Sequence, residues 1–393
     1  MRRERRAAIA GVHEFGPRRV ETMSALQIKA VSAARALEDA GLTWADVDAL
    51  YDAGETGPMA GLTLPGYLGV RPTVIDTTAV GGSSFELHAA HAVRAIAAGK
   101  ARVALLTYGS TAHRDRLAIG TGARSPRGPA GNLEAPYGLT LVGNYAMVAR
   151  RHLHQYGTTS AQLAEIAVTT RAHAMRNPDA VRGLHDLGHR DVREITVEDV
   201  LSSRLIADPL HLFDCCLITD GGGAVVIVAP EVARDLRHRP VWILGTGEAV
   251  GYPEPEADLT VSAAARSGPA AFGEAGVRPE EIDVAMIYDS FTITVLIILE
   301  DLGFCAKGEG GAYVEGGRLR FDRPGAPALN TDGGGLSSNH PGMRGIFLLI
   351  EATRQLRGTS TAQVPGARLA VAHGNGGQLA THHVAGTIVL GRD

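Results

Sequence analysis

Glycine, asparagine and histidine gather in the segment Asn330-Thr331-Asp332-Gly333-Gly334-Gly335-Leu336-Ser337-Ser338-Asn339-His340-Pro341-Gly342. Two shorter segments belong with it, Tyr288-Asp289-Ser290-Phe291 upstream and His373-Gly374-Asn375-Gly376-Gly377 downstream. Glycine lets the main chain approach a ligand closely, and tyrosine and histidine side chains accept or donate protons. We therefore expect the three segments to form one ligand site in the C-terminal part of the chain.

In this order the three segments resemble the catalytic loops of the thiolase superfamily, above all its sterol-carrier-protein-type and lipid-transfer-protein branch. The second loop of that family carries a histidine in a Gly-His-Pro context, which here reads Asn339-His340-Pro341. Classical thiolases place a nucleophilic cysteine at the start of a buried helix in the N-terminal half. The corresponding segment here, Ala79-Val80-Gly81-Gly82-Ser83-Ser84-Phe85, contains no cysteine. The resemblance thus implies a thiolase fold without the covalent chemistry.

The composition excludes several classes of protein. The 393 residues are 45% apolar and 20% charged, with a net charge of −4, which suits a large core and gives no basic surface for nucleic acid. No apolar run is long enough to span a bilayer, and no apolar stretch follows the basic start as a signal peptide requires. These patterns predict a cytoplasmic protein that has no membrane span and does not bind nucleic acid.

Cysteine and histidine spacing indicates neither a disulfide framework nor a metal site. The three cysteines, Cys215, Cys216 and Cys305, lie in apolar contexts, and we expect them to be small buried hydrophobic residues. The histidines outside the three segments lack metal-ligand spacing together with an acidic or cysteine partner. We therefore predict no metal.

The chain repeats itself weakly. Residues 40–48 resemble residues 275–283, and residues 101–109 resemble residues 367–375. Both halves thus share one order of elements: helix, Ala-Gly turn, strand, buried helix, glycine and strand. Helices that alternate with apolar strands predict an α/β fold. The resemblance implies the thiolase architecture of duplicated α/β halves in five layers, αβαβα.

A polar break near residues 234–240 divides the two halves. We expect an N-terminal half at residues 1–235 and a C-terminal half, with the catalytic loops, at residues 236–393. The first half carries an insertion without a counterpart, at about residues 110–205, which opens with a polar loop at 114–136 and continues in helical segments. In thiolases the corresponding insertion covers the active site and contacts coenzyme A.

His340 and Tyr288 are the predicted catalytic residues. The resemblance implies that His340 stabilises the oxygen of a thioester enolate; the alternative is a structural loop histidine. Tyr288 occupies the position where thiolases carry asparagine or histidine. Its segment resembles that of the cysteine-less thiolase-like aldolases of bacterial steroid side-chain degradation, which implies a base; the alternative is a core tyrosine. Those aldolases bring a second tyrosine into the loop before the histidine, where this chain has Ser337-Ser338.

The remaining predicted site residues support this pair. His373 takes the position of the second thiolase cysteine and is predicted to be catalytic, and Asp289 is expected to hold its turn. The predicted oxyanion donors are Asn375, Gly376 and Gly377, and the predicted substrate-binding residues are Gly82, Ser83, Gly334 and Asn339. Ser83 and Ser84 are the hydroxyl nucleophiles near the helix start, but a helix-capping role is favoured for them.

Three functions are compatible with these residues. The first is a carbon–carbon lyase that cleaves a steroid- or lipid-derived β-hydroxyacyl-CoA by a retro-aldol reaction. The second is an acyltransferase of Claisen type that lacks the usual cysteine. The third is a catalytically silent acyl-CoA-binding partner subunit. Coenzyme A would enter as part of the substrate, with no covalently bound cofactor. The resemblance implies a homodimer, paired near residues 76–80, and a zinc-ribbon/OB-fold subunit of the DUF35 type.

Overall fold

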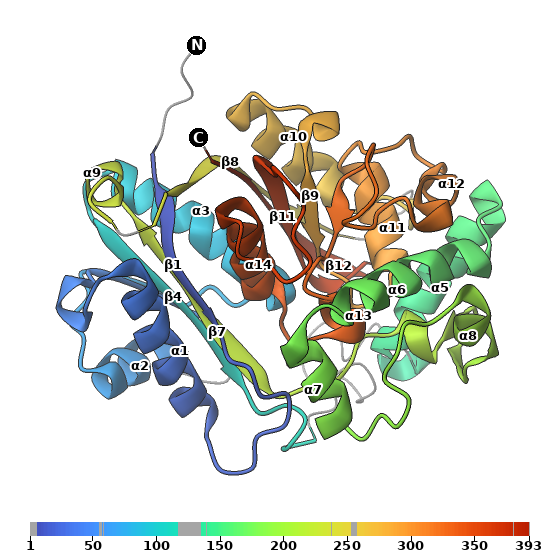
Figure 1. Ribbon diagram of the computed structural model, residues 1–393, viewed down its shortest axis with the longest axis horizontal. Coiled ribbons are helices and arrows are strands. Elements are labelled where there is room, and N and C mark those ends of the chain that lie inside the picture. Colours follow the sequence, from blue (N-terminus) through green and yellow to red (C-terminus); the bar gives the residue numbers. More distant parts are fainter. Residues whose placement is uncertain are drawn as a thin grey trace.

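A mixed β-sheet runs through the whole molecule (Figure 1). The computed structural model describes residues 6–54, 57, 59–116, 135–138, 140–236, 238–252, 258–379 and 381–392. The ten strands of the sheet follow the order β10-β9-β11-β12-β8-β1-β7-β4-β2-β3. Their bounds are β1 Ala8–Glu14, β2 Ala49–Asp52, β3 Val74–Asp76, β4 Val103–Ser110, β7 Gly221–Val228, β8 Val241–Gly251, β9 Val284–Ile287, β10 Ala328–Leu329, β11 Leu369–Gln378 and β12 His382–Gly391.

The sheet consists of two half-sheets with the same strand order. In each half, the strands taken in chain order lie side by side as third, second, fourth, fifth and first. β1 and β8, the first strand of each half, join the halves through antiparallel pairs of Ala8 with Trp242 and of Ile9 with Val241. The predicted boundary at residues 235 and 236 lies in the connection between β7 and β8.

The repeated segments of the sequence form equivalent structures. The helices α1 (Ala25–Ala40) and α10 (Ala264–Ala275) end at Gly41 and Gly276, which adopt left-handed φ angles of 71° and 60°. The carboxylates of Asp48 and Asp283 each accept hydrogen bonds from two main-chain amides at or just before the start of β4 and β11. Local capping signals thus produce the same turn twice.

Two buried helices lie between the half-sheets (Figure 1). α14 (Gly345–Arg357) contacts β1 and β7 on one side and β9 and β11 on the other, and α3 (Ser84–Ala97) packs beside it. Most residues of both helices are buried, including polar ones such as Glu86 of α3 and Glu351 of α14. α1 covers the outer face of the first half-sheet and α10 that of the second. These layers confirm the predicted αβαβα fold.

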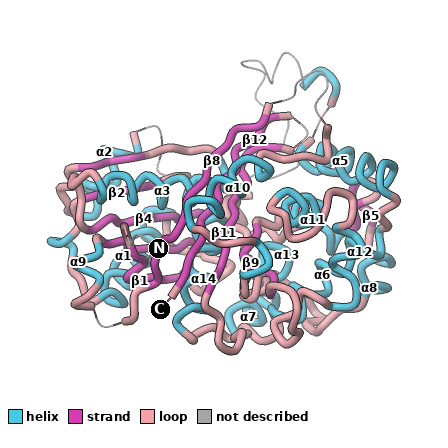
Figure 2. The backbone as a smooth tube through the Cα atoms, turned by 90° about the horizontal axis from the view of Figure 1, so that it is seen from above, coloured by secondary structure: helices cyan, strands magenta, loops and turns pink. Residues whose placement is uncertain are grey.

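The insertion joins β4 to β7 and lies against the second half of the molecule (Figures 1 and 2). Its predicted helical segments are confirmed. The insertion continues past residue 205 into a hairpin, whose two strands form a separate small sheet in the described part of the chain. Residues 117–134 of the predicted polar loop lie outside the described part of the chain. The described elements of the insertion are α5 Leu141–Tyr156, α6 Ser160–Ala174, α7 Pro178–Asp186, α8 Val197–Ser202, β5 Leu205–Ala207 and β6 Leu210–His211.

Of the five other α-helices in the described part of the chain, α11 is buried over its whole length. The five are α2 Ala60–Leu68, α9 Pro230–Ala233, α11 Thr292–Asp301, α12 Gly310–Val314 and α13 Gly334–Ser337. Within the described residues, no helix combines the length and the apolar character needed to cross a lipid bilayer.

Candidate active site

A cavity of about 260 Å³ opens where the insertion meets the start of α3 and the loops of the second half. Most of its wall is apolar, and polar side chains gather at one end. Its lining residues are Gly81, Gly82, Leu141, Val142, Tyr145, Ile206, Leu212, Cys215, Cys216, Ile218, Tyr288, Ser290, Phe291, His340, Gly342, Asn375 and Gly377. The structure therefore brings Gly82, Tyr288, His340, Asn375 and Gly377, all predicted site residues, to one cavity.

Tyr288 and His340 form a hydrogen-bonded pair at the polar end. The Tyr288 hydroxyl lies 3.0 Å from Nε2 of His340, and their rings meet edge-on. Tyr288 follows directly after β9, and its main-chain amide donates to the carbonyl of His373 at 2.9 Å. Both side chains are at most 4% exposed. A rigid strand end thus holds one partner of the pair in place.

Burial keeps both members of the pair uncharged at neutral pH. Desolvation raises the pKa of Tyr288 well above 10, with smaller contributions from Cys216, Tyr108 and Tyr145, while the positive charge of Arg344 opposes the rise. Desolvation and, as a smaller contribution, the positive charge of Arg344 together lower the pKa of His340 to about 4. The resting pair is therefore a phenol beside a neutral imidazole, which can accept a proton.

The main chain around His340 is held from two sides. Thr219 donates its main-chain N–H to the carbonyl of His340 at 3.3 Å, and its Oγ1 accepts the His340 amide at 3.2 Å. The Tyr108 hydroxyl, from β4, donates to the carbonyl of Pro341 at 2.5 Å and accepts the amide of Met343 at 3.0 Å. These contacts fix the turn that presents the imidazole.

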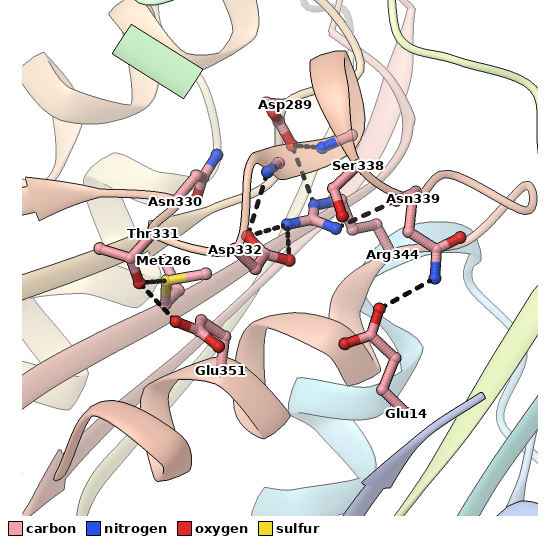
Figure 3. Close-up of polar contacts among 12 residues, drawn as sticks. Glu14, Met286, Asp289, Asn330, Thr331, Asp332, Ser338, Asn339, Arg344 and Glu351 are labelled. Carbon is pink, nitrogen blue, oxygen red and sulfur yellow. Dashed lines mark hydrogen bonds and ion pairs between the residues drawn. The ribbon is translucent and has the colours of Figure 1, made fainter. Parts of the chain in front are cut away.

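A buried ion cluster lies behind the pair (Figure 3). Arg344 is fully buried; its Nε lies 3.0 Å from Asp289, and its Nη2 lies 2.7 Å from both carboxylate oxygens of Asp332. Asp289 also accepts main-chain amides from Gly335 and Leu336. Desolvation raises the pKa of Asp289 to about 6, and Arg344 opposes that rise. Asp289 therefore contacts the loop and not the cavity, as expected of a residue that supports its turn.

His373, a predicted catalytic residue, is not among the residues that line the cavity. Its Nδ1 lies 2.8 Å from the hydroxyl of Thr387, which in turn contacts Ser267 of α10 at 2.8 Å. Its Nε2 has no hydrogen-bond partner among the described residues. Burial lowers the pKa of His373 to about 3, so the ring is neutral. The geometry gives His373 no direct contact with a ligand in this cavity.

Three of the predicted substrate-binding residues also lie behind the wall. The amide of Asn339 accepts from Thr219 and donates to Glu14, and Gly334 packs against the carboxylate of Asp289. Ser83 is fully buried, and among the described residues no group lies within hydrogen-bonding distance of its hydroxyl. A serine nucleophile needs an adjacent base, so Ser83 does not have that geometry.

Ser84 supports the start of α3. Its hydroxyl donates to the carbonyl of Gly81 at 2.7 Å and accepts the amide of Val80 at 3.0 Å. The predicted helix-capping role is therefore not observed: Ser83, the N-cap residue of α3, makes no side-chain capping bond, and the Ser84 hydroxyl bonds only residues that precede the helix.

Four residues at or near the site were not predicted from the sequence. Tyr145, from α5, lines the cavity, stacks on Phe291 and accepts a hydrogen bond from Asn375 at 3.0 Å. Cys215 and Cys216, predicted to be core residues, also line the cavity. Burial raises the pKa of both thiols, to about 12 for Cys215, so neither is a ready nucleophile.

Glu86 is the fourth missed residue. It lies in the first turn of α3, behind the cavity, and neither carboxylate oxygen has a hydrogen-bond partner among the described residues. Desolvation raises its pKa well above 4.5, which favours the protonated, uncharged form. A Cβ on Gly374 would lie 2.1 Å from its Oε2, and one on Gly345 would lie 2.4 Å away. Glycine at these two positions leaves room for the buried acid.

The described residues contain no group of three or more histidine, cysteine or acidic side chains that could hold a metal ion. The polar side chains at the cavity are two phenols, an imidazole, an amide, a serine hydroxyl and two protonated thiols. This set fits a proton-transfer site better than a metal centre.

The duplicated fold and the buried tyrosine–histidine pair together define a thiolase-like enzyme. A family profile described as "Thiolase C-terminal domain-like" matches residues 251–392. The chain is 35% identical over 376 residues to the steroid side-chain-cleaving aldolase of Thermomonospora curvata, covering 91% of this chain and 92% of that protein. It is 33% identical over 369 residues to an acetyl-CoA acetyltransferase of Methanothermobacter thermautotrophicus, covering 88% and 91%.

A solved structure named Ltp2-ChsH2(DUF35) aldolase has the same fold. It superposes with a TM-score of 0.86 at 31% sequence identity, over 98% of each chain. The chain belongs to the thiolase superfamily, in its sterol-carrier-protein-type thiolase-like branch. The predicted family and fold are thereby confirmed.

Proposed function

We propose that the protein is a carbon–carbon lyase that cleaves a β-hydroxyacyl-CoA by a retro-aldol reaction. The observation that carries this proposal is the buried Tyr288–His340 hydrogen bond at the polar end of the cavity. Two further facts support it. No cysteine stands at the start of α3, and a relative over most of the chain is named an aldolase.

The wall of the cavity suits an apolar acyl group. Leu141, Val142, Ile206 and Phe291 line it, and apolar surface binds apolar ligands by excluding water. The name of the Thermomonospora relative specifies a steroid side chain. We therefore propose a steroid- or lipid-derived acyl chain, with coenzyme A as part of the substrate and no covalently bound cofactor.

The proposed reaction begins at the hydroxyl of the substrate. Tyr288 takes the proton of the β-hydroxyl while its own phenol proton passes to Nε2 of His340. This relay suits the resting pair, because the raised pKa of Tyr288 excludes a stable phenolate, whereas the neutral imidazole is free to accept a proton. The Cα–Cβ bond then breaks, Cβ becomes the carbonyl carbon of a ketone or aldehyde, and the bonding electrons form the thioester enolate.

The enolate is then held and protonated. The protonated His340 stabilises its negative charge, together with main-chain amides of the glycines that line the cavity, Gly81, Gly82 and Gly377. Gly376, also predicted as an oxyanion donor, is not among the lining residues. The proton on Nε2 of His340 then passes to Cα of the enolate, which gives the shorter acyl-CoA. The enzyme ends the reaction with the same number of protons as at the start. The sequence assigned the base to Tyr288 and the enolate to His340. In this proposal the two residues share one proton, because Nε2 of His340 faces the Tyr288 hydroxyl.

An acyltransferase is the second candidate. One relative over most of the chain is named an acetyltransferase, and Cys216 offers a thiol at the cavity. The raised pKa of that thiol weighs against covalent transfer, because the attacking species is the thiolate. A catalytically silent acyl-CoA-binding subunit is the third candidate.

The assembly is also a proposal. The solved aldolase that shares the fold is named with a DUF35 component, which supports a subunit of that type for this chain. We further propose a homodimer, located in the cytoplasm.

Variants of the pair test the proposal. We expect Tyr288→Phe to bind acyl-CoA normally and to lower turnover of a β-hydroxyacyl-CoA by roughly 10²–10⁴-fold. We expect His340→Ala to lose about 2.7–4 kcal/mol of transition-state stabilisation. Tyr51→Phe is the matched control, because Tyr51 is equally buried but is not at the cavity. The assay measures the released ketone or aldehyde together with the shorter acyl-CoA.

The wild-type protein should be assayed with and without a DUF35-type subunit. Turnover of Tyr288→Phe near the wild-type value would refute the relay. Tight binding of a β-hydroxyacyl-CoA without cleavage under both conditions would favour the silent subunit.

A further inference from the structure

Arg344 joins the two segments that carry Tyr288 and His340, although it does not line the cavity. Its Nε contacts Asp289, the residue after Tyr288, and its Nη2 contacts Asp332, at the start of the histidine loop. Its Nη1 donates to the carbonyl of Asn339, the residue before His340, at 3.0 Å. One guanidinium thus contacts a neighbour of each member of the catalytic pair (Figure 3).

The packing around Gly335 places this charge next to the imidazole. A Cβ on Gly335 would lie 3.1 Å from Oδ1 of Asp289, 3.1 Å from Cδ2 of His340 and 3.2 Å from Cδ of Arg344. The three side chains therefore converge on one point, and glycine is the residue that fits there. Since the cluster is fully buried, little solvent screens the charge from the pair.

We infer that Arg344 is the positioning residue of this site, which holds the Tyr288 and His340 loops in one arrangement and keeps a positive charge beside their hydrogen bond. The expected effect of Arg344 on turnover rests on the proposed function. Its effects on the arrangement of the two loops and on the pKa values of the pair do not. A planar guanidinium binds two carboxylates and a carbonyl in a fixed fork, which a lysine ammonium does not reproduce.

The charge acts on both members of the pair in the same direction. Arg344 lowers the pKa of His340 and opposes the rise in the pKa of Tyr288. The other groups that act on Tyr288 are Cys216, Tyr108, Tyr145 and His340, and all of these are neutral in the resting site. Removing the charge should therefore raise both pKa values, whereas a merely structural contact would leave them unchanged.

Arg344→Met and Arg344→Lys separate charge from geometry. In Arg344→Met, we expect the pKa of His340 to rise from about 4 toward its ordinary value of 6.5, with a turnover loss of about 10²-fold. In Arg344→Lys, we expect the His340 pKa to stay low while turnover falls, because the fork is lost. The titration is followed by NMR of isotope-labelled histidine, with His340 assigned from the spectrum of His340→Ala.

Arg18→Met is the matched control. Arg18 is also fully buried, donates to the carbonyl of Ser338 in the same loop and pairs with the carboxylate of Glu14. Its charge is not among the causes that shift the pKa of His340. We expect this variant to lower the melting temperature without moving the titration of His340.

The outcomes distinguish this inference from the proposed reaction, because the titration needs no turnover. An unchanged His340 pKa in folded Arg344→Met overturns the electrostatic role, and unchanged turnover in an active enzyme overturns the positioning role. Should Arg344→Met fail to fold, Asp332→Asn carries the test, since it keeps the arginine and removes a negative charge. We then expect the His340 pKa to fall below that of the wild type, and an unchanged value overturns the inference.

Discussion

Gly82 leaves the space that the ring of Tyr288 occupies, and an alanine at this position would take that space away. A Cβ on Gly82 would lie 2.1 Å from Cε2 and 2.4 Å from Cζ of Tyr288, and 2.5 Å from the main-chain oxygen of Asn375. Carbon atoms in contact are separated by about 3.5–4.0 Å. The tyrosine ring and the main chain around Gly82 must therefore both shift, because moving the ring alone does not relieve the contact with the oxygen of Asn375.

The size of that movement sets the expected effect. The ring has to shift by more than about 1 Å to restore contact distances, which would break a hydrogen bond of ordinary length. Misplacement of a catalytic group by about 1 Å costs on the order of 10²-fold in rate. Overpacking of a buried site costs about 1–3 kcal/mol of stability. Gly82→Ala should therefore lose both activity and stability.

The assay compares Gly82→Ala with Gly273→Ala. A Cβ on Gly273, within helix α10, would meet no atom within 4 Å, so this control should keep full activity and gain up to about 1 kcal/mol of stability. Turnover of β-hydroxyacyl-CoA and thermal melting are measured for both variants. Gly82→Ala with wild-type turnover and an unchanged melting temperature would refute the reasoning.

Incubation with an acyl-CoA should leave no adduct on Cys215 or Cys216 in peptide mapping, because burial keeps both thiols protonated; a stable adduct would favour covalent acyl transfer. Light scattering at micromolar concentration should show a dimer, and Ile75→Lys on the edge strand β3, where Ile75 is 48% exposed, should yield monomers. A wild-type monomer contradicts the proposed assembly. Hydrogen bonds to Asp76 and Glu248 raise the pKa of His91 from 6.5 to about 9. The stabilisation from this pairing is complete below pH 6.5 and is lost as the pH rises through 9. The melting temperature of the wild type should therefore fall between pH 6.5 and pH 9, and that of His91→Gln should fall less.

The fold could be predicted because its signals are local and occur twice. Gly41 and Gly276 end equivalent helices, and Asp48 and Asp283 precede equivalent strands. Each signal lies within a few residues of the element it controls, so the repeat can be recognised without knowing any contact between distant residues. The resemblance of the loop around His340 to one family then supplied the arrangement of the layers.

The far wall of the cavity could not be predicted, because it depends on contacts between distant segments. Cys215 has apolar neighbours in the sequence, and only its bridge to Phe291 reveals that it faces the site. Arg344 follows Met343 and precedes an apolar helix, with no sign of the two carboxylates that surround it. His373 and Asn375 lie on the same face of β11, but His373 is about 7 Å deeper along the strand, where α10 covers it.

The first half, the insertion and the second half contribute different groups to the cavity. This division bears on how such a protein evolves. Among the described residues, the first half supplies only main chain, through Gly81 and Gly82, while the insertion supplies most of the apolar wall. The proton-transferring side chains, Tyr288 and His340, come from the second half. A substitution of an apolar wall residue in the insertion, such as Leu141 or Val142, therefore changes which ligand fits and leaves in place the contacts of Thr219 that hold His340. Selection for a new substrate acts mainly on the apolar wall residues, and selection for reactivity acts on Tyr288 and His340. Single substitutions in the wall can therefore change the substrate range while the catalytic pair is kept.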